Sequence, residues 1–277
     1  MNWQIAAFYK FVPLPAPEEV RARIETNAAG LGLCGTVLVA SEGLNGTIAG
    51  HGQAVQQFVQ ALAATNEIGA LSVKYSSAAE KPFGMLKVRI KKEIVTFGAP
   101  GSDPRKQVGT YVAPEDWDAL IGCDDVVLID TRNSYEVGIG TFRGAIDPGT
   151  RSFREFPSFV KGNLDPTRHK RVAMFCTGGI RCEKATAYML SQGFEQVYHL
   201  DGGILNYLAC GPKERSSWVG ECFVFDERVS VDHDLKRGSY VLCESCGVPV
   251  EKTQKQAQCA NCMSVEAGRG KSAATAE

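Results

Sequence analysis

The spacing of apolar residues changes along the chain and predicts the order of its elements. Runs of aromatic and β-branched residues at 3–11 and 34–40 indicate strands, and the segment 17–32 begins with proline and acids and ends at glycine, as a helix does. A second helix is predicted over 52–66, where apolar residues form one stripe. Shorter strands are expected at 47–49, 71–76 and 85–90. The resulting β-α-β-β-α-β order is typical of a ferredoxin-like α+β domain.

A different pattern begins near Thr110, where short apolar strands alternate with helices. The strands are expected at 126–130, 172–176 and 196–200, and the helices at 114–121, 183–192 and 203–209. Alternation of this kind predicts an α/β domain with a parallel sheet. The run 98–114 before it is rich in glycine and proline, as a linker is.

Together these patterns predict an α/β multidomain chain with a cysteine-rich end. We find no internal repeat. The expected divisions are a ferredoxin-like (acylphosphatase-like) domain at 1–97, a linker at 98–109, an α/β domain at 110–211, a zinc-ribbon-like C-terminal region at 212–265 and a disordered tail at 266–277.

Composition narrows the class of protein. With 277 residues, 44% hydrophobic residues and a net charge of −1, the chain can bury a sizeable core in two or three domains. The first residues lack the basic and apolar segments of a signal peptide, and we expect a cytoplasmic protein with no membrane partner. No glycine-rich nucleotide-binding motif indicates flavin, NAD or ATP.

The most informative residue is Cys176, which follows an apolar strand and precedes a helix. We expect a tight loop of six residues between these elements. In such a loop, backbone N–H groups converge on the first side chain, the helix N-terminus adds positive potential and Arg181 supplies a full charge. The sulfur should therefore be a thiolate, which makes Cys176 a candidate nucleophile.

The spacing within this loop favours sulfur chemistry. Four residues separate Cys176 from Arg181, whereas cysteine phosphatases use one residue more to wrap a tetrahedral phosphate. A persulfide-type site is the better fit, and the alternative is a buried hydrophobic cysteine followed by an ordinary glycine turn. The expected catalytic loop consists of Cys176, Thr177, Gly178, Gly179, Ile180 and Arg181.

The Cys176 loop and its surroundings resemble a rhodanese domain. The segment 128–149 resembles the rhodanese strand that ends in Asp-x-Arg, and 197–207 resembles its last strand and Gly-Gly turn. More narrowly, the chain resembles the bacterial rhodanese-related tRNA uridine(34) hydroxylases, and this resemblance extends to about Cys262. The blocks that carry it are SEGLNGTIAG (41–50), KVRIKKEIVTFG (87–98), CTGGIRCEKA (176–185) and ECFVFDERV (221–229).

The family resemblance implies an oxidoreductase that converts the wobble uridine of the tRNA anticodon loop to 5-hydroxyuridine. It implies a monooxygenase-type reaction with molecular oxygen and an unidentified electron donor, in which Cys176 is essential. The residues by themselves support a sulfurtransferase that carries sulfane sulfur as a Cys176 persulfide, and this is the alternative function. An inert binding module is disfavoured because Cys176 and Arg181 are both intact.

A basic run between positions 81 and 106 predicts a second functional surface. In a strand, Lys87, Arg89 and Lys91 would place three cations on one face. Such a face suits an RNA backbone, and the alternative is an ordinary solvated edge strand protected by lysines.

The segment Glu42–Gly46 supplies two more candidates for RNA binding, Glu42 and Asn45. Its match to the family suggests a loop that faces the substrate. The alternative is a turn built on the Asn-Gly pair, which is common in turns.

Three residues near the Cys176 loop are candidate supporting groups. Asp130 and Arg132 are expected to hold the end of the sheet by hydrogen bonds and an ion pair. Cys182 is expected to pack with its side chain away from Cys176, and the alternative is a resolving thiol for an oxidised Cys176.

Four cysteines near the C-terminus have the spacing of two metal-binding knuckles. The pattern is Cys243-x2-Cys246-x12-Cys259-x2-Cys262, and Gly247 permits the turn after the first pair. Four thiolates favour a structural zinc ion with no open position for catalysis. An iron–sulfur cluster or a reversible redox role are the alternatives, because the ligand type alone does not separate them.

Overall fold

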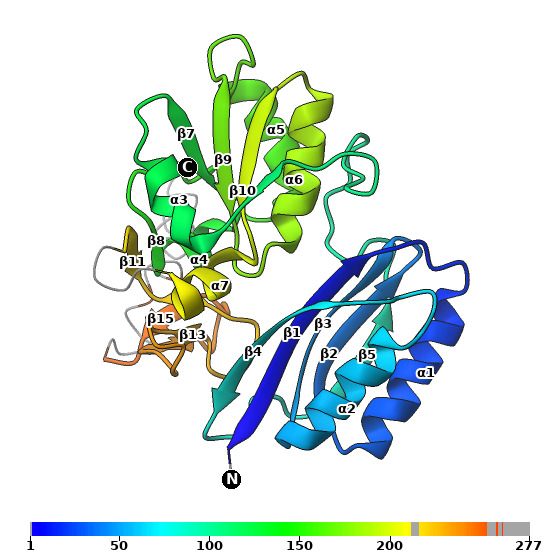
Figure 1. Cartoon of the computed structure of the whole chain (residues 1–277). Helices are drawn as coiled ribbons and strands as arrows, with labels where there is room; N and C mark the ends of the chain where they lie inside the picture. The colour runs from blue at the N-terminus through cyan, green and yellow to red at the C-terminus, as the bar shows by residue number, and fades with distance from the viewer. Residues whose placement is uncertain (1, 212–215, 254–258, 260–261, 263–277) are drawn as a thin grey trace, which may run out of the picture.

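The computed structural model describes residues 2–211, 216–253, 259 and 262. It confirms the predicted fold class, with an acylphosphatase-like N-terminal domain, a rhodanese domain built on a parallel sheet and a cysteine cluster near the C-terminus (Figure 1). The predicted disordered tail at 266–277 lies outside the described residues.

The N-terminal domain is a five-stranded sheet in the order β4-β1-β3-β2-β5. Figure 1 shows its two helices side by side against the sheet. The last strand, β5, extends the ferredoxin-like order by pairing in parallel with β2. The elements are β1 (Trp3–Phe11), α1 (Pro17–Gly30), β2 (Cys34–Ala40), β3 (Gly43–Gly50), α2 (Gly52–Ala63), β4 (Ser72–Ala78) and β5 (Leu86–Ile90).

The two faces of this sheet have different surroundings. Phe8, Val37 and Ile48 are buried beneath the two helices, together with Phe58 of α2. Because side chains alternate along a strand, the residues between them face the other way. We call this opposite side the open face, and its strands carry Tyr9, Thr36, Thr47 and Lys74 into a cavity.

The hairpin between β2 and β3 differs from the prediction. Strand β3 begins at Gly43, so Asn45 and Gly46 lie inside the strand and the turn consists of Ser41 and Glu42. A Cβ atom on Gly46 would lie 3.0 Å from side-chain atoms of both Phe8 and Val37. Glycine therefore serves close packing at this position, and not a turn.

The rhodanese domain is a parallel sheet in the order β6-β10-β9-β7, with helices on both faces. Apolar side chains of β9 are buried on both faces, which explains its uninterrupted hydrophobic run. The elements are β6 (Thr110–Val112), α3 (Pro114–Ile121), β7 (Val126–Asp130), α4 (Ser134–Val137), β8 (Gly140–Phe142), the 3₁₀ turn Phe153–Glu155, α5 (Phe156–Asn163), β9 (Arg171–Phe175), α6 (Ile180–Ser191), β10 (Gln196–Leu200) and α7 (Gly203–Cys210).

The C-terminal strands begin as part of the rhodanese core. Strand β11 (Trp218–Gly220) pairs with β8, and Trp218, Cys222 and Val224 are buried in the same cluster as Trp117. Cys243 and Cys246 of the cysteine cluster lie in the turn of the last hairpin, and Cys259 and Cys262 follow that hairpin. The remaining strands are β12 (Cys222–Phe223), β13 (Ser230–Val231), β14 (Tyr240–Leu242) and β15 (Pro249–Glu251).

Candidate active site

Cys176 is the first residue after β9, at the carboxyl edge of the parallel sheet, and it is buried. The backbone N–H of Gly179 donates a hydrogen bond to its sulfur at 3.1 Å. Gly179 has a φ of +97°, in the left-handed region that favours glycine, and it allows α6 to begin at Ile180. The helix starts three residues before the predicted Glu183, so Arg181 and Cys182 belong to its first turn and not to the loop.

The start of α7 braces the Cys176 loop from behind. Backbone N–H groups of Ile204 and Leu205 donate to the carbonyl oxygens of Cys176 and Thr177 at 2.9 and 3.0 Å. A Cβ atom on Gly203 would lie 2.4 Å from the Cys176 oxygen, so only glycine fits here. The Gly-Gly turn of the rhodanese pattern therefore positions Cys176.

Arg181 is held by a partner that the sequence interpretation missed. Its guanidinium donates two hydrogen bonds to the Glu136 carboxylate, at 2.6 and 2.7 Å, and both side chains are buried. Burial opposes ionisation of Glu136, but the charge and hydrogen bonds of Arg181 lower its pKa. Asn133 and Glu136 form a capping box on α4, and that Asn-x-x-Glu spacing was the available local signal.

Cys182 faces Cys176, which differs from the expected orientation. Burial favours a neutral Cys176 thiol, but hydrogen bonding from the Cys182 thiol, the charge of Arg181 and nearby backbone N–H groups together lower the Cys176 pKa to about 5. Burial and the neighbouring Cys176 raise the pKa of Cys182. The Thr131 hydroxyl lies 3.6 Å from the Cys182 sulfur. The pair therefore consists of one thiolate and one thiol at neutral pH.

Asp130 and Arg132 form a buried ion pair at 2.6 Å. The Asp130 carboxylate also accepts a hydrogen bond from Thr141 at 2.9 Å, and Arg132 donates to the Gly140 carbonyl at 2.5 Å. These contacts join the end of β7 to β8. The partners of Asp130 and Arg132 in these contacts belong to the rhodanese domain itself.

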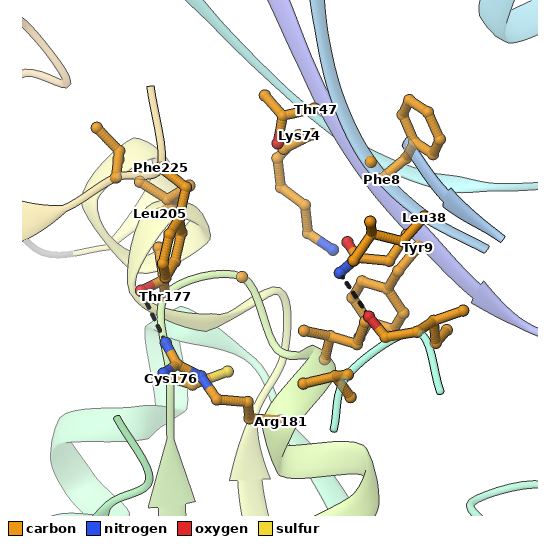
Figure 2. A pocket seen from close by; sticks show the side chains of 18 of the residues that line it. Phe8, Tyr9, Leu38, Thr47, Lys74, Cys176, Thr177, Arg181, Leu205 and Phe225 are labelled. Carbon is orange, nitrogen blue, oxygen red and sulfur yellow. Dashed lines mark hydrogen bonds between the residues drawn. The ribbon is translucent and has the colours of Figure 1, made fainter. Parts of the chain in front are cut away.

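A cavity of about 1210 Å³ separates the Cys176 loop from the open face of the N-terminal sheet. In Figure 2, Cys176, Thr177 and Arg181 lie on one side of it, and Thr47 and Lys74 project from the N-terminal domain on the other. The Cys176 sulfur thus lines a cavity whose walls come from two domains.

Four of the predicted RNA-binding residues lie either at the edge of the open face or in the cavity lining. Lys87 and Arg89 are exposed at the edge of the open face, where they pair in register with Thr36 and Leu38 of β2. Lys91 and Asn45 line the cavity. Asn45 also donates to the Ile94 carbonyl at 3.1 Å.

Glu42 takes part in a contact between the domains. Its carboxylate accepts the backbone N–H of Ile94 at 2.7 Å and pairs with Lys184 of α6 at 2.9 Å. Lys184 is buried and pairs also with Glu93 at 2.8 Å. Next to it, Glu183 accepts hydrogen bonds from Tyr9 and Tyr111 at 3.0 and 2.8 Å. The helix that carries Arg181 and Cys182 therefore also docks the N-terminal domain.

The four C-terminal cysteines come together as the spacing predicts. Their sulfur atoms all lie within 4.8 Å of one another, with 3.8 Å between Cys243 and Cys262 and 3.7 Å between Cys246 and Cys259. A tetrahedral ion with Zn–S bonds of about 2.3 Å requires sulfur separations of about 3.8 Å. Gly247 has a φ of +73° and donates its N–H to the Cys243 carbonyl, as a knuckle requires. The donor set therefore fits a structural zinc ion.

Comparison with known proteins places this arrangement in a family. A protein of Teredinibacter turnerae named tRNA uridine(34) hydroxylase is 54% identical over 255 residues, which cover 92% of this chain and 79% of the relative. The chain belongs to the tRNA uridine(34) hydroxylase family. The predicted family is thereby confirmed.

Two domain families match parts of the chain, and solved structures with low overall similarity were also found. The UPF0176 acylphosphatase-like domain family matches residues 3–94, and the rhodanese-like domain family matches 113–210. A possible tyrosine phosphatase of unknown function from Rhodopseudomonas palustris covers 44% of this chain and 96% of its own, with 22% identity and a TM-score of 0.34. An acylphosphatase from Coxiella burnetii covers 32% and 93%, with 16% identity and a TM-score of 0.27. Among the described residues, no helix has the length and apolar character needed to cross a membrane.

Proposed function

We propose that this protein hydroxylates C5 of the uridine at position 34 of tRNA in the cytoplasm, with Cys176 as its essential catalytic residue. The observation that carries the proposal is the cavity between the Cys176 loop and the open face. Drug-sized ligands occupy pockets of about 300–1000 Å³, so a chamber of 1210 Å³ has room for a nucleotide. A small sulfur acceptor would need no wall from a second domain.

The charges around the cavity support RNA as the substrate. Lys74, Lys91 and Arg154 line it, and Lys87 and Arg89 continue the positive charge along the edge of the open face. Cations arranged along one face bind the phosphate backbone. We infer that the anticodon loop crosses this face while its first base enters the cavity.

The proposed reaction begins with the anionic sulfur. The Cys176 thiolate adds to C6 of the uracil ring and makes C5 nucleophilic towards oxygen. One atom of molecular oxygen replaces the hydrogen at C5, and the other leaves as water with two electrons and two protons from a reductant. Departure of the sulfur from C6 restores the ring and the thiolate. A Cys176 persulfide held by the same N–H groups is the other form of the nucleophile.

The test is nucleoside analysis of tRNA. A strain without this protein should lack 5-hydroxyuridine derivatives at position 34, the intact chain should restore them, and Cys176→Ser should not. Purified protein with tRNA should incorporate labelled oxygen from O₂ only when a reductant is supplied. An unchanged nucleoside profile in the deletion strain would overturn the proposal.

The N–H cradle around Cys176 also favours a second candidate, a rhodanese-type sulfurtransferase. In that reaction Cys176 takes sulfane sulfur from thiosulfate, releases sulfite and passes the sulfur to cyanide or a thiol. Thiosulfate-dependent formation of thiocyanate, together with normal tRNA nucleosides in the deletion strain, would favour this candidate.

A further inference from the structure

An aromatic side chain lies exposed at the Cys176 cavity. Phe225 is 62% exposed, and it lines the cavity beside Thr177 and Leu205 (Figure 2). Of its neighbours in sequence, Val224 is buried and the side chain of Asp226 is only 3% exposed. The ring therefore contributes little to the core and presents apolar surface to the space above the reactive sulfur.

The side chain of Phe225 packs against other side chains in this position. Its ring packs edge-on against Phe223 at a centroid distance of 5.1 Å, and Phe223 packs in the same way against Tyr135 at 5.3 Å. On the other side, the Arg181 guanidinium lies 6.0 Å from the ring centroid of Phe225. An aromatic residue with such support keeps its orientation when a ligand arrives, which lowers the entropy lost on binding.

The turn that carries Phe225 is built to a fixed shape. Asp226 and Arg228 form an ion pair at 2.7 Å, and Arg228 also donates to the Ser76 hydroxyl of β4 at 3.2 Å. Val229 has a φ of +65°, which is strained for a β-branched residue. Strain of this kind persists only where the surroundings enforce it, and it is concentrated at binding sites.

The surroundings of the ring identify the ligand. Lys74, Lys91, Lys92 and Arg154 line the same cavity, so an exposed flat ring stands among cations from both domains. Acidic residues line the cavity too, but Glu93 already pairs with Lys184 and Asp226 with Arg228. Single-stranded nucleic acid satisfies both features, because its phosphates pair with the cations and its bases stack on aromatic rings.

We propose that Phe225 is a stacking site for a nucleobase of the RNA substrate, adjacent to the uridine that enters the Cys176 cavity. The inference rests on the proposed function and assigns a second base-binding position to it. The stacked base would splay the anticodon loop and hold the target base away from its neighbour.

The test uses an anticodon stem-loop RNA with 2-aminopurine at position 35, beside the target uridine. Binding to the wild type should quench the fluorescence by stacking. Phe225→Leu keeps an apolar side chain but removes the ring, and it should weaken binding on the order of tenfold and abolish the quenching. Phe225→Trp should preserve both. The salt dependence of affinity should not change in Phe225→Leu, because no charge is removed.

Val219→Ala is the matched control, because Val219 is also exposed and apolar but lies outside the cavity lining. It should bind and quench as the wild type does. The experiment is repeated with 2-aminopurine at position 33, on the other side of the target uridine. If wild type and Phe225→Leu show equal quenching and equal affinity with both probes, the stacking site alone is overturned. Absence of binding to the wild type would overturn the proposed function together with it.

Discussion

At the scale of single residues, the Cys176 thiolate is stabilised by groups of its own loop and helix, and the sequence interpretation missed the Cys182 thiol among them. Arg181 donates two hydrogen bonds to Glu136, and the negative charge of Glu136 offsets part of the positive charge that Arg181 presents to the sulfur. The Cys182 thiol and the Gly179 N–H contact Cys176 directly. The expected loop electrostatics are present, and the hydrogen bond from the Cys182 thiol adds to them in lowering the Cys176 pKa.

This arrangement predicts the effect of Cys182→Ala. A hydrogen bond to a charged group contributes about 1.5–3 kcal/mol, so its loss should raise the Cys176 pKa by about 1–2 units. The thiolate of the wild type forms as pH rises through about 5, and in the variant the transition should lie correspondingly higher. The measurement is the rate of Cys176 alkylation by iodoacetamide against pH, followed by mass spectrometry.

Cys123→Ala serves as the control because Cys123 is exposed and distant in sequence from the loop. It should follow the wild-type pH curve. Identical curves for Cys182→Ala and the wild type would show that Cys182 only packs.

At the scale of elements, sequence patterns predict well those strands whose ends do not depend on the backbone or packing role of a glycine. The predicted strand bounds of β1, β2, β7 and β10 coincide with those observed. The predictions for β3 and α6 are wrong by a few residues, because Gly46 makes room for Phe8 and Val37 inside a strand, and Gly179 has a left-handed φ that lets the helix begin early. A glycine that interrupts a sequence pattern does not reveal whether it bends the backbone or makes room for a neighbour.

The edge strand β5 predicts a salt-dependent loss of RNA affinity. Changing Lys87, Arg89 and Lys91 together to glutamine should flatten the slope of log affinity against log salt by about 2–3, since fewer counterions are released. Affinity should fall alike for many tRNAs. The matched control changes three exposed cations of the rhodanese domain, Lys161, Arg168 and Lys170. Equal slopes in the two triple variants would make β5 an ordinary solvated edge.

The last hairpin predicts a dependence on metal. The purified protein should contain about one zinc ion, and Cys243→Ser with Cys246→Ser should remove it and make the C-terminal segment protease-sensitive, because binding supplies folding free energy there. The exposed cysteines Cys123 and Cys210, changed to serine, should leave the zinc content unchanged. Iron and sulfide together with visible charge-transfer absorbance would show that the cysteines hold an iron–sulfur cluster instead of zinc. Absence of any stoichiometric metal would contradict both the zinc site and the cluster.

At the scale of the whole molecule, the cavity depends on contacts that sequence analysis does not find. Glu93 and Lys184 are 91 residues apart and Tyr9 and Glu183 are 174 apart, so no local pattern joins them. Each is an ordinary polar residue in its own element. These side chains become partners only when the two domains dock. The sequence alone therefore could not distinguish a Glu42 that faces the substrate from a Glu42 that pairs with Lys184.

The buried cation at this interface predicts a loss of stability. Lys184→Met keeps the length of the side chain but leaves Glu42 and Glu93 facing each other, and it should lower the free energy of unfolding by about 2 kcal/mol. Lys161→Met, at an exposed position of α5, should have almost no effect. Denaturant unfolding measures both, and equal midpoints would contradict the prediction.

The same contact predicts a dependence on pH. Burial raises the pKa of Glu93, but the hydrogen bond and charge of Lys184 lower it by more. A carboxylate with a lowered folded pKa stabilises the fold above its unfolded pKa of about 4.3, and this contribution is lost as pH falls through the folded value. The stability difference between wild type and Lys184→Met should therefore shrink as pH falls below about 4. A difference that stays constant down to pH 3 would remove Glu93 from the contact.

Helix α6 serves both the Cys176 site and the contact between the two domains, and this double role bears on how the domains could evolve. Arg181 and Cys182 serve the sulfur, and the next two residues, Glu183 and Lys184, serve the neighbouring domain. A gene that encodes a separable domain can be cut at its boundary and its product reused elsewhere. Here such a cut would remove both carboxylates that pair with Lys184 and one wall of the cavity, and Lys184 lies three residues after Arg181 in α6. A substitution at Glu42 or Glu93 therefore acts on the helix that carries Arg181 and Cys182, and we expect the two domains to be inherited together.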